Sequence, residues 1–496
     1  MRFIYPILFV VISVKASAQT ETVYLNYDPF FEDSTLAEHT VVKPVLIKRT
    51  EKTGYDIIHN GRSKTEYLRL YPAINAVGAF VGHEAEDYLS YRLQSGIGFE
   101  TNISGKFHLR GNVLAGYSEI NANEEGRNTL IQNTYFYNPS GVNAVEVQPR
   151  IRASYQANKF FNLQAGIDQQ FIGEGRRSLL MSDYAAPHPF FQLRTQFWKI
   201  QFVNLYQFFR ENIGGSVIHK YASTHLLNFQ CTKRFQIGLY ESVLFSPKDS
   251  LLNRGYEIEY LNPFLFYRPT EYSIGSQDRL VLGINLSYRF DNLMIYGQFL
   301  FDDFVLNELV NRTRWWANKY SGQIGIKGKE RFSRTTFRYI TELNFARPFT
   351  YTHLGLSTNY GHQGMSLTHP LGANFVEVYN EFSLHLENSL TIQLYLQFIQ
   401  QGGEDANSTT SYGADVYEPY TLKPFDYGYR IGGNGKINRT RIMLELNAPL
   451  LKKSAMIAFL RGGIEASQRG DKTVQMIPII YTGIRTNLWN DRSFTF

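Results

Sequence analysis

The chain has 496 residues, of which 15% are aromatic and 19% are charged. Cys231 is the single cysteine, so an internal disulfide framework is excluded. The formal net charge of +6 is small and evenly spread, which argues against a nucleic-acid-binding protein. The 34 Tyr and 37 Phe are more than a soluble protein usually carries. Membrane β-barrels need aromatic residues for their two interfacial girdles.

The first residues predict a secretory signal peptide. A basic Met1-Arg2 pair precedes an apolar stretch at 3–14, and 16–18 is an Ala-Ser-Ala cleavage pattern. We therefore expect residues 1–18 to be removed. The chain has no later apolar run of about 18 residues, the length that a transmembrane helix needs. A membrane chain without such a helix must close into a barrel, because every backbone group needs a partner.

The next segments divide the mature chain into two parts. Residues 19–69 mix charges with short apolar runs and are expected to plug the barrel or to lie in the periplasm. Residues 70–496 are expected to form the barrel itself. Within them, the hairpin at 373–400 is the clearest example of alternation. Val376 and Val378 fall on one face of its first strand, while Glu377 and Glu381 fall on the other. This period of two predicts strands with one lipid-facing and one water-facing side.

The spacing of the turns predicts the topology. Short turns are expected near 104–105, 158–159, 198–199, 232–233, 291–292, 328–329, 388–389 and 451–452. After a first connection near 84–89, longer connections separate them, near 119–145, 172–188, 211–221, 246–278, 303–318, 347–373, 401–437 and 468–473. This alternation predicts an all-β, transmembrane antiparallel barrel of the bacterial outer membrane with about 18 strands, short periplasmic turns and long extracellular loops. The strand at 70–83 should close against the strand at 474–488. The terminal Phe496 fits the end of such a chain.

Three loop stretches are candidates for a binding site, at 170–187, 260–278 and 347–374. They combine Gly and Pro, which fix irregular backbone, with polar groups beside Tyr rings, as a sugar or an anionic glycan requires. The candidate polysaccharide-binding residues are Arg177, Ser178, Asp183, Tyr267, Arg268, Glu271, Asp278, His353, His362 and Asn374. The alternative is that the loops fold inward and pack against each other. Trp315 and Trp316 are a further candidate for stacking on sugar, or members of an interfacial girdle.

Enzyme motifs are absent from the sequence. The Gly173-Glu174-Gly175 run lacks the ending of a phosphate loop. Ser178 and Ser182 do not lie in a nucleophile elbow. The histidines of the third stretch do not have the spacing of a metal site on one element. We therefore expect no enzyme activity, no catalytic residue, no metal and no cofactor.

The motif at 173–187 reads Gly-x-Gly-x-Arg-Ser-Leu-Leu-x-Ser-Asp followed by Ala-Pro-x-Pro, and resembles the Wzi capsule-assembly family. The runs Asn262-Pro263 to Asp278 and His369 to Asn374 are similar to its Bacteroidetes branch, which includes the gliding-motility protein RemB. The resemblance covers roughly residues 70–490. Residues 19–69 depart from it, because they do not read clearly as the helices that precede the barrel in Wzi proteins of enteric bacteria.

The resemblance implies an 18-stranded outer-membrane barrel that binds exported polysaccharide in capsule or exopolysaccharide assembly and attachment. Its implied partners are outer-membrane lipid and lipopolysaccharide, surface polysaccharide, the barrel assembly machinery and secretion or motility proteins. Two alternatives stay open. One is a cell-surface component of gliding motility or adhesion that works through protein partners. The other is a diffusion porin, which a crowded lumen disfavours.

Overall fold

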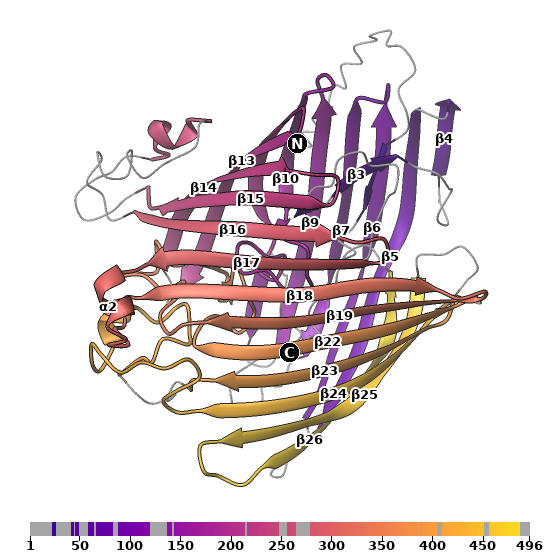
Figure 1. Cartoon of the computed structure of the whole chain (residues 1–496). Helices are drawn as coiled ribbons and strands as arrows, with labels where there is room; N and C mark the ends of the chain where they lie inside the picture. Colours follow the sequence, from indigo (N-terminus) through magenta and orange to yellow (C-terminus); the bar gives the residue numbers. More distant parts are fainter. Residues whose placement is uncertain are drawn as a thin grey trace, which may run out of the picture.

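A computed structural model describes 14 stretches of the chain, which are residues 22–25, 41–43, 45–48, 58–63, 66–82, 88–119, 136–140, 143–213, 216–247, 255–263, 278–387, 389–403, 409–450 and 456–486. The predicted signal peptide and terminal Phe496 lie outside them. In these stretches, the chain forms a closed antiparallel barrel of 18 strands (Figure 1). The barrel strands are β5 (Glu66–Val81), β6 (Tyr88–Ile103), β7 (Phe107–Glu119), β9 (Asn143–Gln156), β10 (Phe161–Asp168), β12 (His188–Phe197), β13 (Ile200–Ile213), β14 (Ser216–Gln230), β15 (Phe235–Phe245), β16 (Arg279–Arg289), β17 (Leu293–Asp303), β18 (Lys319–Arg331), β19 (Thr335–Ala346), β22 (Phe375–Leu386), β23 (Thr391–Gln401), β24 (Ile437–Pro449), β25 (Met456–Arg469) and β26 (Gln475–Thr486).

Shorter elements accompany the barrel. They are β1 (Thr22–Leu25), β2 (Val42–Lys43), β3 (Val45–Lys48), β4 (Ile58–Ser63), β8 (Phe136–Ser140), β11 (Phe171–Ile172), β20 (Gly361–His362), β21 (Met365–Ser366), α2 (Leu306–Val310) and two 3-10 turns, η1 (Ile258–Leu261) and η2 (Tyr420–Leu422). None of the helices in the described stretches is long and apolar enough to cross a membrane.

The predicted topology is confirmed. β26 pairs with β5, with Ile479 opposite Val81 and Arg485 opposite Asn75, so the first and last barrel strands close the sheet. Short turns collect at one end, which we call the turn end, and most of the longer connections collect at the other, the loop end. In outer-membrane barrels the long connections are extracellular.

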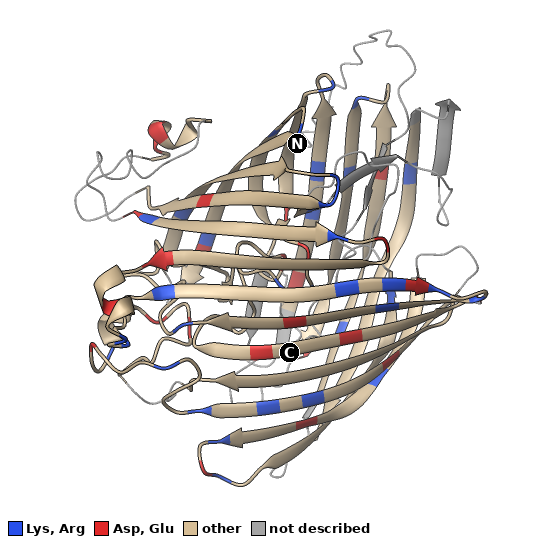
Figure 2. Cartoon of the chain, viewed as in Figure 1, with Lys and Arg blue, Asp and Glu red and all other residues tan. Residues whose placement is uncertain are grey.

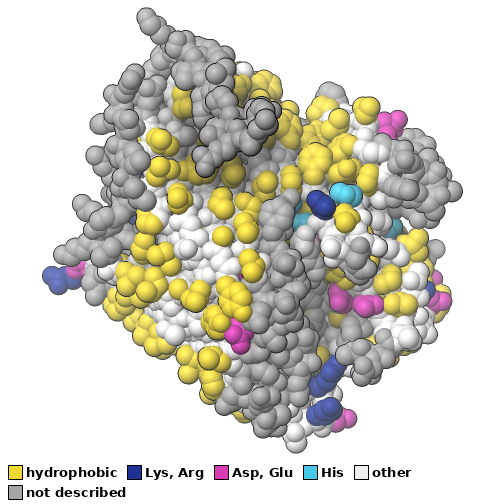
Figure 3. Space-filling model, turned by 180° about the vertical axis from the view of Figure 1, so that it is seen from behind, with side chains coloured by type: hydrophobic (Ala, Val, Ile, Leu, Met, Phe, Trp, Pro, Cys, Tyr) yellow, Lys and Arg dark blue, Asp and Glu magenta, His cyan; other side chains and the backbone are white. Residues whose placement is uncertain are grey.

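The wall is polar inside and apolar outside. On β22, Glu377, Tyr379 and Glu381 are buried, while Val376 and Val378, which alternate with them, are more exposed. This inverts the pattern of a soluble protein and confirms the alternation expected from the sequence. Charged residues accordingly lie at mid-strand positions of β19, β22 and β24 (Figure 2). Seen from behind, much of the described outer surface carries hydrophobic side chains (Figure 3).

Two predicted connections are wrong. Residues 211–221 were expected to form a long loop, but β13 continues to Ile213 and β14 begins at Ser216. The charges that suggest a loop point into the barrel, where Lys220 Nζ lies 2.6 Å from Glu211 Oε1. Similarly, β18 runs through the turn expected at 328–329 and ends at Arg331. In a sequence, charged residues that face the lumen can therefore be mistaken for turn residues.

Part of the predicted N-terminal segment lies among the buried lumen residues. β2 pairs with β11, with Lys43 opposite Phe171 and Val42 opposite Ile172. Gly173 N donates a hydrogen bond to the carbonyl oxygen of Val41 at 2.9 Å. These three residues agree with the plug alternative, while the assignment of 19–69 as a whole stays a prediction.

The connection between β15 and β16 returns over the outer face of the wall. Tyr206 Oη donates to the carbonyl oxygen of Leu261 at 3.0 Å, and the hydroxyls of Ser223 and Tyr256 are 2.6 Å apart. Tyr206 and Ser223 belong to the outward-facing set, because the register places them opposite each other and beside the outward Val243. The protein's own chain therefore covers this part of the wall, which we call the covered sector.

A polar row crosses the outer face next to the covered sector. Asn204, His225 and Glu241 lie opposite one another on β13, β14 and β15, and the row continues to the lipid-facing Leu282 on β16. All three polar side chains are buried, and His225 Nδ1 lies 3.8 Å from Glu241 Oε2. Ionisable groups are costly on the lipid face of a barrel, and their burial removes them from that contact.

Candidate functional site

Two connections fold into the barrel from its loop end and meet in the lumen. We call them the inner loops, residues 169–187 and 347–374. Their backbones are joined where Ser182 N donates to the carbonyl oxygen of Leu367 at 2.8 Å. Nearly every side chain of 169–187 is buried. The inner loops are therefore part of the core of the protein, although they are loops by sequence.

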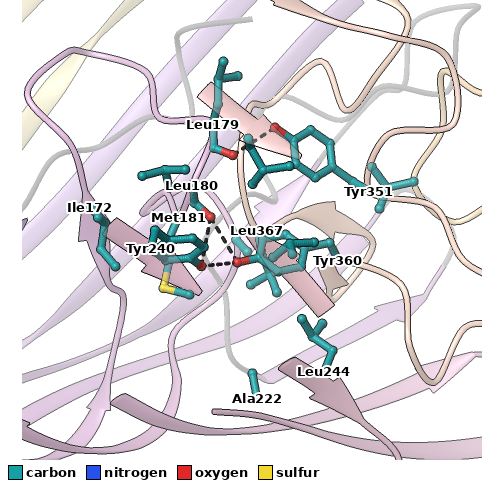
Figure 4. Packing of buried hydrophobic residues seen from close by; sticks show 14 of the residues in the cluster. Ile172, Leu179, Leu180, Met181, Ala222, Tyr240, Leu244, Tyr351, Tyr360 and Leu367 are labelled. Atoms are coloured by element: carbon teal, nitrogen blue, oxygen red, sulfur yellow. Dashed lines mark hydrogen bonds between the residues drawn. The ribbon is translucent and has the colours of Figure 1, made fainter. Parts of the chain in front are cut away.

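Tyrosine hydroxyls secure the tip of the first inner loop (Figure 4). Tyr351 Oη donates to the carbonyl oxygen of Leu179 at 2.9 Å. The carbonyl oxygen of Leu180 accepts from Tyr240 Oη at 3.2 Å and from Tyr360 Oη at 3.0 Å. Buried carbonyl groups need such partners, since an unsatisfied one costs stability. The Leu179-Leu180 pair is thereby fixed among buried apolar side chains.

The glycine spacing of the first inner loop reflects close packing. A Cβ atom added to Gly175 would lie 2.0 Å from Glu342 Oε1, a contact that no larger residue can make. Glu342 approaches because its carboxylate accepts the backbone N–H groups of Arg176 and Arg177. The second glycine of the Gly-x-Gly pattern is thus explained by a carboxylate that binds the loop backbone.

The two arginines of the motif are held by lumen carboxylates. Arg176 forms a two-pronged contact with Glu381, with Nε to Oε2 at 2.7 Å and Nη2 to Oε1 at 2.5 Å. Arg177 is 0% exposed, and its Nη2 lies 3.5 Å from Glu377 Oε1. Its guanidinium also lies 4.7 Å from the centre of the Tyr379 ring. A side chain in this position holds the fold and cannot touch a ligand without movement of the loop.

The other described candidates from the first two stretches also contact groups of the protein itself. Ser178 Oγ donates to the carbonyl oxygen of Ile172 at 2.5 Å. Asp183 is buried. Asp278 Oδ2 accepts from Tyr260 Oη at 2.7 Å and so ties the covered sector to the start of β16. Tyr267, Arg268 and Glu271 lie outside the described residues.

The candidates from the second inner loop are not close together as one group. His353 Nδ1 lies 2.6 Å from Thr358 Oγ1, near the loop end. His362 is buried, with its ring centre 5.2 Å from that of Phe209. Asn374 donates to the carbonyl oxygen of Tyr412 at 3.0 Å and accepts from Gly432 N at 2.9 Å, so it joins two connections. Their role in polysaccharide binding stays a prediction.

Burial is the largest cause of a lowered pKa at two histidines. Burial, followed by the nearby Arg279 and Lys319 cations, lowers the pKa of His353 from 6.5 to about 3. Burial also lowers the pKa of His362 well below its ordinary value. Both side chains are therefore neutral at physiological pH. The described residues contain no group of His, Cys, Asp and Glu side chains able to hold a metal ion.

A second group of residues lies above the inner loops and is partly open to solvent. The connections 304–318 and 409–436 run alongside each other. Their backbones are joined by Trp316 N to Asp426 O at 2.9 Å, Gly428 N to Thr313 O at 3.4 Å and Tyr429 N to Arg314 O at 3.1 Å. They carry five aromatic side chains that are at least partly exposed and that we call the aromatic rim, namely Trp315, Trp316, Tyr420, Phe425 and Tyr427.

Rings and a cation lie against each other in the aromatic rim. The ring centres of Trp316 and Tyr420 are 4.8 Å apart. Lys423 Nζ lies 4.7 Å from the centre of the Trp316 ring. Tyr427 is 54% exposed and Phe425 is 40% exposed, so ring surface is open to a ligand. An open aromatic face beside a hydrogen-bonding cation suits the apolar face and hydroxyls of a sugar ring.

The sequence identifies only part of this group. The sequence predicts either a sugar-stacking platform or, in preference, an interfacial girdle for Trp315 and Trp316. Their partners Tyr420, Phe425 and Tyr427 were missed, because they come from another loop. The density of aromatic residues in 409–436 was the available signal.

Comparisons with known proteins support the fold. No family model matches the chain, and no curated protein matches it. Among solved structures, the barrel is similar to Wzi of Escherichia coli, an outer-membrane protein involved in group 1 capsule assembly and described as a carbohydrate-binding β-barrel. That match has a TM-score of 0.52 and 14% identity, and covers 82% of this chain and 84% of Wzi.

Two further similar structures are outer-membrane proteins. OprD of Pseudomonas aeruginosa has a TM-score of 0.42 and 9% identity, with 86% of this chain and 97% of OprD covered. OccAB1 of Acinetobacter baumannii has a TM-score of 0.44 and 10% identity, with 84% and 96% covered. At these identities the likeness concerns the fold. The protein is an 18-stranded β-barrel of the outer-membrane type, with a fold similar to that of Wzi.

Proposed function

We propose that the protein binds a surface polysaccharide at the loop end of an outer-membrane barrel and retains it at the cell, in capsule or exopolysaccharide assembly and attachment. It would act as a binding protein without covalent chemistry. The observation that carries the proposal is the aromatic rim, where ring surface from two connections is exposed beside Lys423, above a lumen occupied by the inner loops. The carbohydrate binding described for Wzi supports the same reading.

The arrangement of the inner loops favours this function over diffusion. A porin needs a continuous water path through its lumen, whereas here buried apolar residues of both inner loops pack together between the walls. We expect the purified barrel to give little conductance in planar bilayers. Steady single-channel conductance would favour the porin alternative instead.

The binding site is tested with the strain's own surface polysaccharide, purified and fluorescently labelled. Trp316→Ala and Tyr427→Ala should each weaken binding, on the order of 2 kcal/mol or roughly thirtyfold in Kd for an aromatic anchor. Trp198→Ala is the matched control, because Trp198 is 69% exposed at the turn end. Equal binding by all three folded variants would remove the aromatic rim from the site.

A resemblance to the Bacteroidetes branch of the Wzi-like proteins, including RemB, leaves the motility and adhesion role as a second proposal. In that case protein partners would act in place of polysaccharide. Deletion of the gene separates the two. Loss of cell-bound polysaccharide supports the first proposal, whereas normal polysaccharide with impaired surface movement or adhesion supports the second.

A further inference from the structure

An apolar segment at the loop end continues the lipid-facing surface of the barrel. Phe299 and Phe301 lie on the outer face of β17, with ring centres 4.5 Å apart. The Phe301 ring is followed at 5.4 Å by that of Phe304, the first residue after the strand. α2 lies directly beyond, at the ends of β17 and β18 (Figure 1). The aromatic contacts of the outer face therefore continue past Asp303, the exposed last residue of the strand.

We call residues 304–314 the rim segment. Its first seven residues include five exposed, large apolar side chains, which are Phe304, Val305, Leu306, Leu309 and Val310. Leu306 is 61% exposed and Val310 is 70% exposed, and they lie on the same side of α2 because they are four residues apart. A soluble surface rarely carries so dense an apolar group, and one that continues a lipid-facing wall fits the acyl chains of the adjacent leaflet.

Two arginines lie just beyond the apolar residues in the sequence. Arg312 and Arg314 are exposed, and no ion pair of either side chain occurs among the described residues. The nearest acidic residue in sequence, Glu308, is engaged by Thr313, whose Oγ1 donates to Glu308 Oε2 at 2.6 Å. Both arginine side chains are therefore available to an anion outside the protein.

The rim segment is held in this shape before any ligand binds. Asn318 Oδ1 accepts the backbone N–H of Val305 at 2.7 Å, and Arg314 O accepts from Tyr429 N. Arg312 and Arg314 have φ angles of 53° and 58°, a left-handed backbone that is uncommon for residues with a side chain. Two such residues in three positions set the directions of both arginines relative to α2.

We propose that the rim segment binds a phosphorylated glycolipid of the outer leaflet. The apolar side chains of α2 contact its acyl chains, and Arg312 and Arg314 form charge-assisted hydrogen bonds with its headgroup phosphates. The continuity with the lipid-facing wall selects a membrane lipid as the occupant, because a soluble anion would make no use of the five apolar side chains. This site shares no side chain with the aromatic rim, although both lie on the connection 304–318, and its role does not depend on the proposed function.

The test uses the full barrel in nanodiscs of zwitterionic lipid, with fluorescent bisphosphorylated lipid A as the probe and its dephosphorylated form as the comparison. The wild type should prefer the phosphorylated form. Arg312→Ala/Arg314→Ala should remove this preference, a loss of roughly thirtyfold, since each basic side chain near an anionic lipid surface contributes about 1 kcal/mol. Leu306→Ser/Val310→Ser should weaken both forms alike.

Arg234→Ala is the matched control, because Arg234 is an exposed arginine at the turn end. It should bind both forms as the wild type does. Intact barrels are verified for each variant by the mobility shift on heating. Equal binding of the two lipid forms by the wild type, or an unchanged preference in the double arginine variant, would overturn the proposal.

Discussion

The first inner loop and the rim segment contain similar types of residue but place them in opposite environments. Each has two arginines within three positions, a short apolar run and a backbone fixed by neighbouring connections. In the inner loop, Arg176 and Arg177 are enclosed by Glu381 and Glu377. In the rim segment, Arg312 and Arg314 face outward. The comparison teaches that an arginine pair at a loop indicates either a structural lock or a binding site, and that burial decides between them.

The largest difference should appear on truncation of an arginine. Arg177→Ala removes one partner of the buried Glu377, which keeps His369 Nε2 at 2.7 Å, and should cost about 3 kcal/mol, the lower end for a broken buried ion pair. Arg312→Ala should change the free energy of unfolding by less than about 0.5 kcal/mol, as for other exposed positions. Thermal unfolding in detergent, followed by the mobility shift on heating, measures both. Equal effects of the two substitutions would abolish the distinction.

A smaller effect is expected from a single hydroxyl. Tyr351→Phe leaves the carbonyl oxygen of Leu179 without the donor at 2.9 Å. The loss of such a buried hydrogen bond costs about 1–2 kcal/mol. Tyr427→Phe, at the exposed aromatic rim, is the matched control and should leave the unfolding temperature unchanged. An unchanged unfolding temperature for Tyr351→Phe would mean that packing alone holds the inner loop in place.

Acidification should weaken the second inner loop. The pKa of His353 is about 3 in the folded protein against 6.5 ordinarily, so below pH 6.5 the unfolded chain binds a proton that the folded one does not. Stability therefore falls as the pH drops from about 6.5 towards 3. His353→Gln should reduce this slope, although His362 contributes in the same direction.

The smallest effect concerns an exposed ion pair. Arg234 Nη2 lies 3.0 Å from Asp291 Oδ1, with side chains that are 52% and 88% exposed. Such pairs contribute about 0–1 kcal/mol. Arg234→Ala should therefore be close to neutral in the same unfolding assay, despite a shorter contact than that of Arg177 with Glu377. A large loss would show that distance matters more than burial.

The sequence was sufficient for the barrel and insufficient for the site. Alternation over β22 and the spacing of turns report on local backbone, so the strands, their sidedness and the closing pair were predictable. The contact of Trp316 with Tyr420 was not, because no local pattern links residues on different loops. The same limit applies to Arg177, whose motif is visible in the sequence but whose enclosure by Glu377 depends on how the loop folds into the lumen.

The covered sector and the buried polar row next to it make one side of the barrel different from the other within the plane of the membrane. Lipid can surround the wall at Leu282 and Ile284, whereas at Asn204 and His225 the wall offers polar groups that lipid does not reach. The surface that a neighbouring membrane protein meets therefore depends on which side of the barrel faces it. Other membrane proteins that approach from the side of β13–β15 meet a polypeptide surface, and those that approach from the side of β16 and β17 meet hydrocarbon-compatible side chains.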